Sequence, residues 1–132
     1  MNIRLPTTEE HGFIYSSWLR SYRNSNYAKD ILNEEYYEGH KEVIKAALDA
    51  DRVWVCDIDG ILVGFVAGDS QCLDFCYVKQ VFRKNRIAES LVRHVAPQFK
   101  ASITTVSHLP KNAREATIKF KLLYSPYYLL RG

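Results

Sequence analysis

The stretch that decides the fold reads Asp74-Phe-Cys-Tyr-Val-Lys-Gln-Val-Phe-Arg-Lys-Asn-Arg-Ile-Ala-Glu-Ser-Leu91. Aromatic and β-branched residues in its first part predict a strand that ends at Val78. Three cationic side chains then precede a predicted helix near Ile87: Arg83, Lys84 and Arg86. The N-terminus of a helix binds anions readily, because it offers unpaired backbone N–H groups and the positive end of the helix dipole. The stretch therefore predicts a phosphate cradle, with a basic surface loop as the alternative.

Hydrophobic patterns on either side extend this strand-loop-helix unit into an α/β (α+β) fold. Asp59-Gly60 marks a hairpin between two of the strands. The predicted strands cover residues 3–5, 52–58, 61–67, 72–78, 102–107 and 124–130, and the predicted helices cover 8–22, 34–49, 87–99 and a segment that starts at 112. The order β-α-α-β-β-β-α-β-α-β predicts a mixed central sheet flanked by helices. In this sheet 72–78 and 102–107 are parallel and joined through helix 87–99.

The composition is typical of one globular domain, residues 1–132. The chain has 132 residues, of which 47% are hydrophobic and 25% are charged. No run approaches the ~20 apolar residues that span a bilayer. The start of the chain also lacks a signal-peptide pattern, so we expect no membrane association. The three cysteines are an odd number without zinc-ligand spacing, which predicts no metal site and small core thiols in a reducing cytoplasm.

Charge is divided unevenly along the chain. Residues 1–76 contain 7 basic and 13 acidic residues, whereas residues 77–132 contain 11 basic and 2 acidic residues. This split suggests a polyanion bound at the second half and a cation at the first, or merely solvated faces. Because no nucleic-acid-binding motif accompanies the basic half, nucleic acid is not an expected partner.

The segment Arg83-Lys-Asn-Arg-Ile-Ala88 resembles the R/Q-x-x-G-x-G/A signature of the GNAT superfamily of acetyl-CoA-dependent N-acetyltransferases. Arg83 fits the first position and Ala88 the last, while Arg86 replaces the usual glycine. The Arg86 side chain either crowds the pyrophosphate or adds a cationic contact. The element order and the hairpin match the family over nearly the whole chain. The resemblance implies a GNAT fold, acetyl-CoA as co-substrate, and transfer of an acetyl group to a primary amine by direct attack.

The resemblance also implies which residues bind acetyl-CoA. In the family the pantetheine arm lies where the fourth strand splays from the fifth, so backbone groups of Tyr77 and Val78 are expected to pair with it. The pyrophosphate is expected to bind the backbone amides of the cradle, which belong to Lys84, Asn85, Arg86, Ile87 and Ala88. The Arg83 side chain is expected to add positive charge. Asn112 either contacts CoA, as in relatives, or caps the last helix.

Two residues are candidates for the general base that deprotonates the amine. Asp74 lies on the fourth strand where relatives often have an acidic residue, and His108 ends the fifth strand beside the cleft. Only one is expected to matter, with Asp74 preferred and its direction fixed by strand alternation. The alternatives are a solvent-facing carboxylate and a surface histidine. Relatives often use a tyrosine of the last helix as the acid. That position is Phe120 here, so Tyr124 is the candidate unless it only packs. The other histidines receive no role: His11, His40 and His94.

The acidic half implies a cationic acceptor, such as a lysine side chain, a protein N-terminus or a polyamine. Five side chains either line its site or form a solvated helix start: Glu34, Glu35, Tyr36, Tyr37 and Glu38. The alternative function is a GNAT-fold module without catalysis that binds a protein partner, which Arg86, Phe120 and the short C-terminus favour. The small size and the aromatic first helix also resemble bacteriophage proteins, which implies the host cytoplasm. An exposed last strand suits a homodimer.

Overall fold

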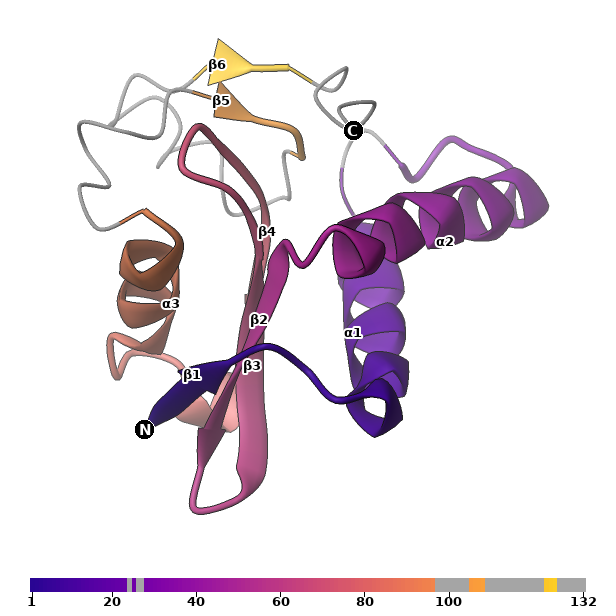
Figure 1. Cartoon of the computed structure of the whole chain (residues 1–132). Coiled ribbons are helices and arrows are strands. Elements are labelled where there is room, and N and C mark those ends of the chain that lie inside the picture. Colours follow the sequence, from indigo (N-terminus) through magenta and orange to yellow (C-terminus); the bar gives the residue numbers. More distant parts are fainter. Residues whose placement is uncertain (24, 26–27, 97–104, 109–122, 126–132) are drawn as a thin grey trace.

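The structure is a computed structural model that describes residues 1–23, 25, 28–96, 105–108 and 123–125. Its strands are β1 (Asn2–Arg4), β2 (Val53–Ile58), β3 (Ile61–Gly68), β4 (Cys72–Val78), β5 (Thr105–Val106) and β6 (Leu123–Tyr124). Its helices are α1 (His11–Arg23), α2 (Asn33–Asp49) and α3 (Ile87–Val95), with short 3-10 turns at Thr8–Glu10 and Gln80–Phe82. Helices α1 and α2 lie on one face of the sheet and α3 lies on the other (Figure 1).

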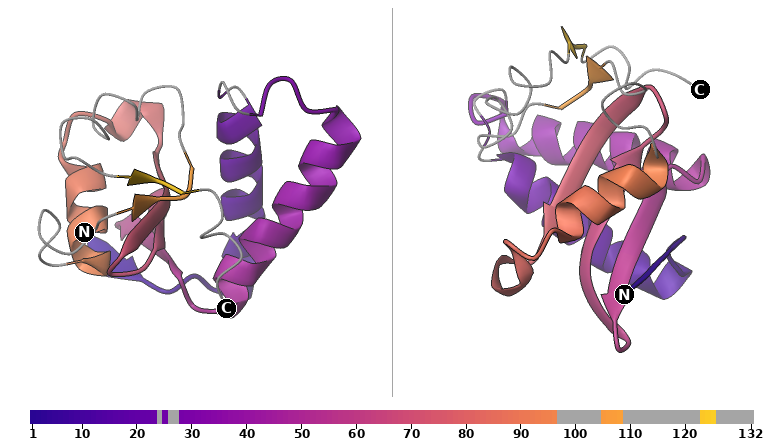
Figure 2. Two further views of the ribbon diagram at one scale, coloured as in Figure 1. Left: turned by 90° about the horizontal axis from the view of Figure 1, so that it is seen from above. Right: turned by 90° about the vertical axis from the view of Figure 1, so that its left-hand side faces the viewer.

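The strands form one mixed sheet in the order β1-β2-β3-β4-β5-β6. Neighbouring strands are antiparallel from β1 to β4, whereas β4 and β5, and then β5 and β6, are parallel. Helix α3 lies between β4 and β5 in the chain, and such a crossover allows two consecutive strands to run parallel. Figure 2 shows the sheet between α3 and the α1–α2 pair. The predicted mixed sheet, with parallel pairing of the fourth and fifth strands, is confirmed.

The predicted hairpin joins β2 and β3. Its central residues both have positive φ angles, 53° at Asp59 and 81° at Gly60. A two-residue turn of this kind matches the right-handed twist of the strands that it connects. The ladder accordingly continues to Ile58, which lies opposite Ile61.

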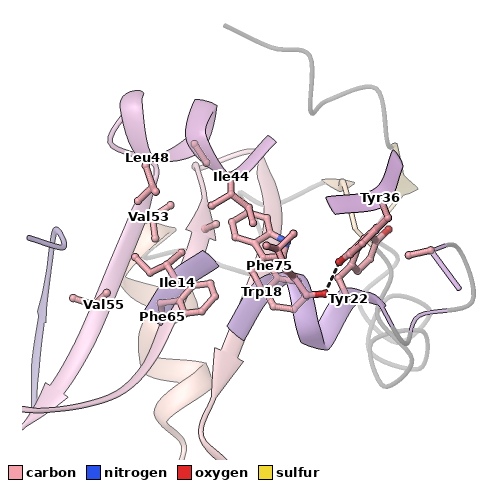
Figure 3. Packing of buried hydrophobic residues seen from close by; sticks show 14 residues of the cluster. Ile14, Trp18, Tyr22, Tyr36, Ile44, Leu48, Val53, Val55, Phe65 and Phe75 are labelled. Carbon is pink, nitrogen blue, oxygen red and sulfur yellow. Dashed lines mark hydrogen bonds between the residues drawn. The ribbon is translucent and has the colours of Figure 1, made fainter. Parts of the chain in front are cut away.

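The core consists of one cluster of buried side chains on each face of the sheet. On the α1–α2 face, the rings of Trp18 and Phe75 stack with their centroids 5.3 Å apart, and Phe65 packs beside them (Figure 3). On the α3 face, Leu91 packs with Val66, and both are fully buried. Burial of each large apolar side chain contributes about 1.5–3 kcal/mol. The two clusters therefore hold all three helices against the sheet.

The helix predicted over 87–99 is shorter than expected. It ends at Val95, and Ala96 has φ −137° and ψ 89°. Proline disfavours the helical conformation in the residue that precedes it, so Pro97 ends the helix here. Strand β6 begins at Leu123, one residue before the predicted start. The predicted helix from 112, the first part of strand 102–107 and residues 126–130 lie outside the described residues.

Candidate active site

In the part of the chain that the structure describes, β4 pairs with β5 only through its first two residues. The register covers Cys72 and Leu73 of β4, and the Ser107 amide donates to the Leu73 carbonyl at 3.1 Å. Strand β4 also bulges at this point, because Leu73 and Phe75 lie opposite consecutive residues of β3. Asp74 is the extra residue of this bulge, which breaks the alternation of side chains. The bulge turns Asp74 toward β5, so simple alternation did not predict its direction.

Among the described residues, no strand pairs with the second half of β4 on its β5 side, and we call this edge of β4 the opening. The Lys79 amide donates to the Val63 carbonyl of β3 at 2.8 Å. Alternation along the antiparallel ladder then turns the backbone groups of Tyr77 toward β3, and those of Cys76 and Val78 toward the opening. The expectation that Tyr77 presents its backbone to a ligand therefore does not agree with the register.

The basic loop brings the N-terminus of α3 to the end of β4. Lys84 and Arg86 have φ angles of 70° and 60°, and α3 begins at Ile87 without a side-chain capping bond from Arg86. The Ser90 amide is bonded to the Arg86 carbonyl at 3.1 Å, whereas the amides of the first turn have no acceptor within the helix. Backbone amides beside a left-handed turn at a helix N-terminus are suited to bind an anion.

Two side chains of the loop stabilise its conformation. Arg83 Nε donates to the Val78 carbonyl at 2.9 Å, which fastens the loop to the end of β4 and uses one of the five N–H groups of the guanidinium. Asn85 Nδ2 donates to the Phe82 carbonyl at 3.3 Å. Since the Val78 carbonyl is already an acceptor, the Val78 amide is the group that this residue offers to the opening.

Arg86 adopts a backbone conformation that glycine favours. Its φ of 60° and ψ of 20° lie in the left-handed region. This region costs an L-residue with a Cβ atom about 1–2 kcal/mol, whereas glycine adopts it freely. The chain thus keeps the glycine-like backbone of the cradle and adds an exposed cation to it.

Four polar side chains form a hydrogen-bonded series, the polar chain, that links β4, the residues after β5, and α2: Asp74, Ser107, His108 and His40. The Ser107 hydroxyl lies within hydrogen-bonding distance of Asp74 Oδ1 and 3.0 Å from His108 Nδ1. On the other side of the same ring, His108 Nε2 lies 2.8 Å from His40 Nε2. Asp74, Ser107 and His108 are 4%, 1% and 2% exposed, while His40 is partly exposed. The structure therefore connects the two candidate bases through Ser107 and extends the chain to His40.

Aromatic rings enclose both histidines. The His40 ring stacks on Tyr22 and Tyr36 with centroid distances of 5.0 and 5.4 Å. His108 meets Tyr22 and Trp18 edge-on at 4.5 and 5.2 Å. The Tyr36 hydroxyl donates to a backbone carbonyl of α1 at 2.6 Å, which fixes one side of this enclosure (Figure 3). Burial lowers the pKa of His40 to about 4, so the ring is neutral near pH 7.

Sequence reasoning missed His40 and Ser107. Helical spacing could have identified His40, because Tyr36, His40 and Ile44 follow one another at intervals of four on the inner side of α2. Ser107 carries no such signal, since its partner Asp74 is 33 positions away in the sequence.

The other predicted site residues lie on further elements or outside the described residues. Tyr124 is on β6 opposite Val106, so β5 separates it from β4. Asn112 and Phe120 lie outside the described residues. Tyr36 is 3% exposed and belongs to the core, whereas the other predicted acceptor-side residues are exposed: Glu34, Glu35, Tyr37 and Glu38.

Neither a metal site nor a membrane span occurs in the described ranges. No three of the histidine, cysteine, aspartate and glutamate side chains described there gather closely enough to hold an ion. No helix among the same residues has both the length and the apolar character needed to cross a bilayer.

Comparison with known proteins identifies the fold. No family model and no curated protein matches the sequence. A GCN5-related N-acetyltransferase from Rhodopseudomonas palustris is 17% identical with a TM-score of 0.55, covering 89% of this chain and 78% of that chain. The chain has the GNAT fold.

Two further GNAT-fold structures were solved with ligands. The aminoglycoside N-acetyltransferase AAC(6')-Iy in complex with CoA is 15% identical with a TM-score of 0.58, and the match covers 94% of this chain and 88% of that chain. The protein yncA from Salmonella typhimurium, with its cofactor acetyl-CoA, is 13% identical with a TM-score of 0.57, and the match covers 91% and 75%. At such identities the likeness concerns the fold.

Proposed function

We propose that this protein is an N-acetyltransferase that transfers the acetyl group of acetyl-CoA to a primary amine. The observation that carries the proposal is the edge of β4 on its β5 side, with which no described strand pairs after Leu73. It begins at the bond between Ser107 and Leu73 and leads along β4 to the uncapped N-terminus of α3. One extended, anionic ligand with a polar arm suits such a path.

The chemistry of the donors fits acetyl-CoA. The first-turn amides of α3, with the exposed cations of Lys84 and Arg86, would hold the pyrophosphate. The backbone groups of Cys76 and Val78 at the open edge would pair with the pantetheine amides. The bound group supplies a thioester carbonyl for attack by the amine. A backbone amide of β4 beside that carbonyl would stabilise the charge that develops on its oxygen.

The acceptor is proposed to be cationic, as a lysine side chain, a protein N-terminus or a polyamine is. Exposed carboxylates of α2 support this choice: Glu34, Glu35 and Glu38. They precede His40 by two to six residues on the helix whose inner side meets the polar chain. A field of this sign concentrates cations at the surface and repels free anions.

Thermal unfolding with and without acetyl-CoA tests the binding part of the proposal. A ligand at 100 times its Kd stabilises the folded protein by about 2.7 kcal/mol, so the Tm of the wild type should rise at millimolar acetyl-CoA. Arg86→Ala should reduce the shift. Arg93→Ala should not, because Arg93 lies at the far end of α3 and pairs with Glu89. An unchanged Tm of the wild type would contradict the proposal.

Thiol release from acetyl-CoA in the presence of a panel of amines tests the reaction. We expect release with cationic primary amines and none with carboxylate-bearing amines of the same length. A Tm shift without release from any amine would instead favour the second function, a GNAT-fold module that binds a protein partner.

A further inference from the structure

We infer that His40 accepts the proton of the attacking amine, and that His108 and Ser107 relay this charge to Asp74. The inference rests on the proposed function, and it assigns one direction to the polar chain. It also gives a role to the histidine of α2, which stands 68 positions from its partner His108 in the sequence.

The direction follows from the proton inventory of the chain. An ionised Asp74 can only accept, so the Ser107 hydroxyl donates to it. Ser107 Oγ then accepts from His108 Nδ1–H at 3.0 Å. A neutral imidazole carries one proton, so His108 Nε2 holds a lone pair and accepts from His40 Nε2–H at 2.8 Å. His40 Nδ1 is thereby left as an acceptor at the end of the chain.

Exposure indicates where the proton enters. Three members of the chain are at most 4% exposed, and His40 is the member with partial exposure. It also lies on α2, whose exposed carboxylates favour the approach of a cationic amine. An amine can thus meet the chain at His40 without disturbing Ser107 or His108.

The surroundings of His40 disfavour a charged ring, so a proton that the ring accepts is passed on to His108. Among the described residues, the titratable groups that face His40 are Tyr22 of α1, Tyr36 of α2 and His108 after β5. The Trp18 ring also meets it edge-on, and Arg23 lies 5.1 Å over the Tyr36 ring. Desolvation among these rings lowers the pKa of His40 to about 4, so an imidazolium is unfavourable there. Transfer to the Asp74 carboxylate removes the charge, because the protonated chain is then neutral throughout.

A cationic amine loses two protons when it is acetylated. The first moves to His40 Nδ1, the His40 Nε2 proton to His108 Nε2, the His108 Nδ1 proton to Ser107 Oγ, and the hydroxyl proton to Asp74. The neutral amine nitrogen then forms a bond to the thioester carbon, the carbon–sulfur bond breaks, and the second nitrogen proton passes to the departing CoA thiolate. Asp74 later returns its proton through the chain to solvent. No oxidant or further reactant is needed.

The tautomers of the two histidines provide a test that does not depend on turnover. Long-range ¹H–¹⁵N spectra of histidine-labelled protein at pH 7 distinguish Nδ1–H from Nε2–H, and the variants His40→Gln and His108→Gln assign the signals. We expect His108 to carry its proton on Nδ1 and His40 to carry it on Nε2. Ser107→Ala should shift the His108 signals more than the His40 signals, because Ser107 contacts His108 directly. The opposite tautomer at either histidine in the wild type would overturn the inference.

Kinetics test the proton transfer itself. His40→Gln should lower kcat about 100-fold or more at pH 7 and leave the KM for acetyl-CoA unchanged, with partial recovery at pH 9.5 where more amine is unprotonated. Ser107→Ala, which keeps both rings, should also lower kcat. The matched control is His94→Gln, which should behave like the wild type. His94 is an exposed histidine of α3 that packs against Trp54 of β2.

The outcomes separate this inference from the proposed function. A wild type that binds no acetyl-CoA refutes both. A wild type that binds and turns over, while His40→Gln and Ser107→Ala keep full kcat, refutes the relay alone. If His40→Gln fails to fold, the wild-type tautomers and the Ser107→Ala kinetics still decide.

Discussion

The two ends of β4 present polar groups in opposite ways. At its start, Asp74 and its partner Ser107 are 4% and 1% exposed and are bonded to each other. At its end, the cations of the loop are exposed, and the first-turn amides of α3 have no capping side chain. One end is a buried network of hydrogen bonds, and the other is an exposed basic surface.

Under the proposed function, we expect the two ends to have different roles. Polar groups in a dry network interact strongly and tolerate no loss of a partner, because the remaining groups are left buried without a hydrogen bond. Exposed cations are screened by water and salt and contribute individually small amounts to binding. We therefore expect substitutions in the network to change turnover or folding, and substitutions in the cradle to change the affinity for acetyl-CoA.

The largest expected effect concerns the buried network. Asp74→Asn and His108→Gln should each lower kcat/KM about 10²–10⁴-fold at pH 7. Members of one chain act as a unit, so the double variant should lose little more than the worse single variant. Initial rates with any accepted amine measure this. If the fold-losses in kcat/KM of the two single variants multiply in the double variant, the two residues act independently. If one single variant keeps full activity, only the other residue acts in proton removal.

The contrast also explains what the sequence could predict. The cradle is made of consecutive residues, so its charge and its strand-loop-helix setting were visible in one segment, Asp74–Leu91. The network joins three elements, and its bonds span 33 and 68 positions. Asp74 and His108 were found singly, but no local pattern indicates that Ser107 connects them. The bulge at Asp74 is likewise set by the register of β3 with β4, which strand alternation in one sequence does not show.

Gly64 tests how closely β3 and β4 approach at the cradle end. A Cβ atom built on Gly64 lies 2.4 Å from the Tyr77 carbonyl oxygen and 3.2 Å from Val78 Cα. Both are backbone atoms that cannot move aside alone, so Gly64→Ala should lower the free energy of unfolding by about 1–3 kcal/mol. Urea denaturation measures it. Gly39→Ala is the control, because a Cβ there meets nothing within 4 Å and alanine in a helix stabilises by about 0.5–1 kcal/mol. Equal effects of the two substitutions would contradict the close approach.

The pH dependence of stability sharpens the description of the network end. His40 has a folded pKa of about 4, whereas an unfolded histidine has about 6.5. Between these values the unfolded chain binds a proton that the folded chain does not, so stability falls as the pH decreases from 6.5 to 4. We expect a loss of about 1–2 kcal/mol in this window, reduced by the partial exposure of the ring, and His40→Gln should remove it. The Glu10 carboxyl, whose pKa Arg4 lowers to about 2, loses its contribution mainly at lower pH. Identical pH profiles of the wild type and His40→Gln between pH 6.5 and 4.5 would exclude a buried neutral ring.

Arg86 gives the smallest effect and separates the backbone of the cradle from its charge. Arg86→Gly relieves the left-handed conformation at φ 60°, against the greater freedom of glycine in the unfolded chain. The net change in the free energy of unfolding should therefore stay within about 1 kcal/mol. Arg86→Ala removes the same charge but keeps the Cβ atom, so it should be the less stable of the two. If the guanidinium contacts the pyrophosphate, both variants weaken acetyl-CoA by a similar factor, about tenfold for a charged hydrogen bond. If the side chain only obstructs the cradle, Arg86→Gly instead binds more tightly than the wild type. Titration calorimetry at two salt concentrations distinguishes these results, because a lost phosphate contact also reduces the salt dependence of the Kd.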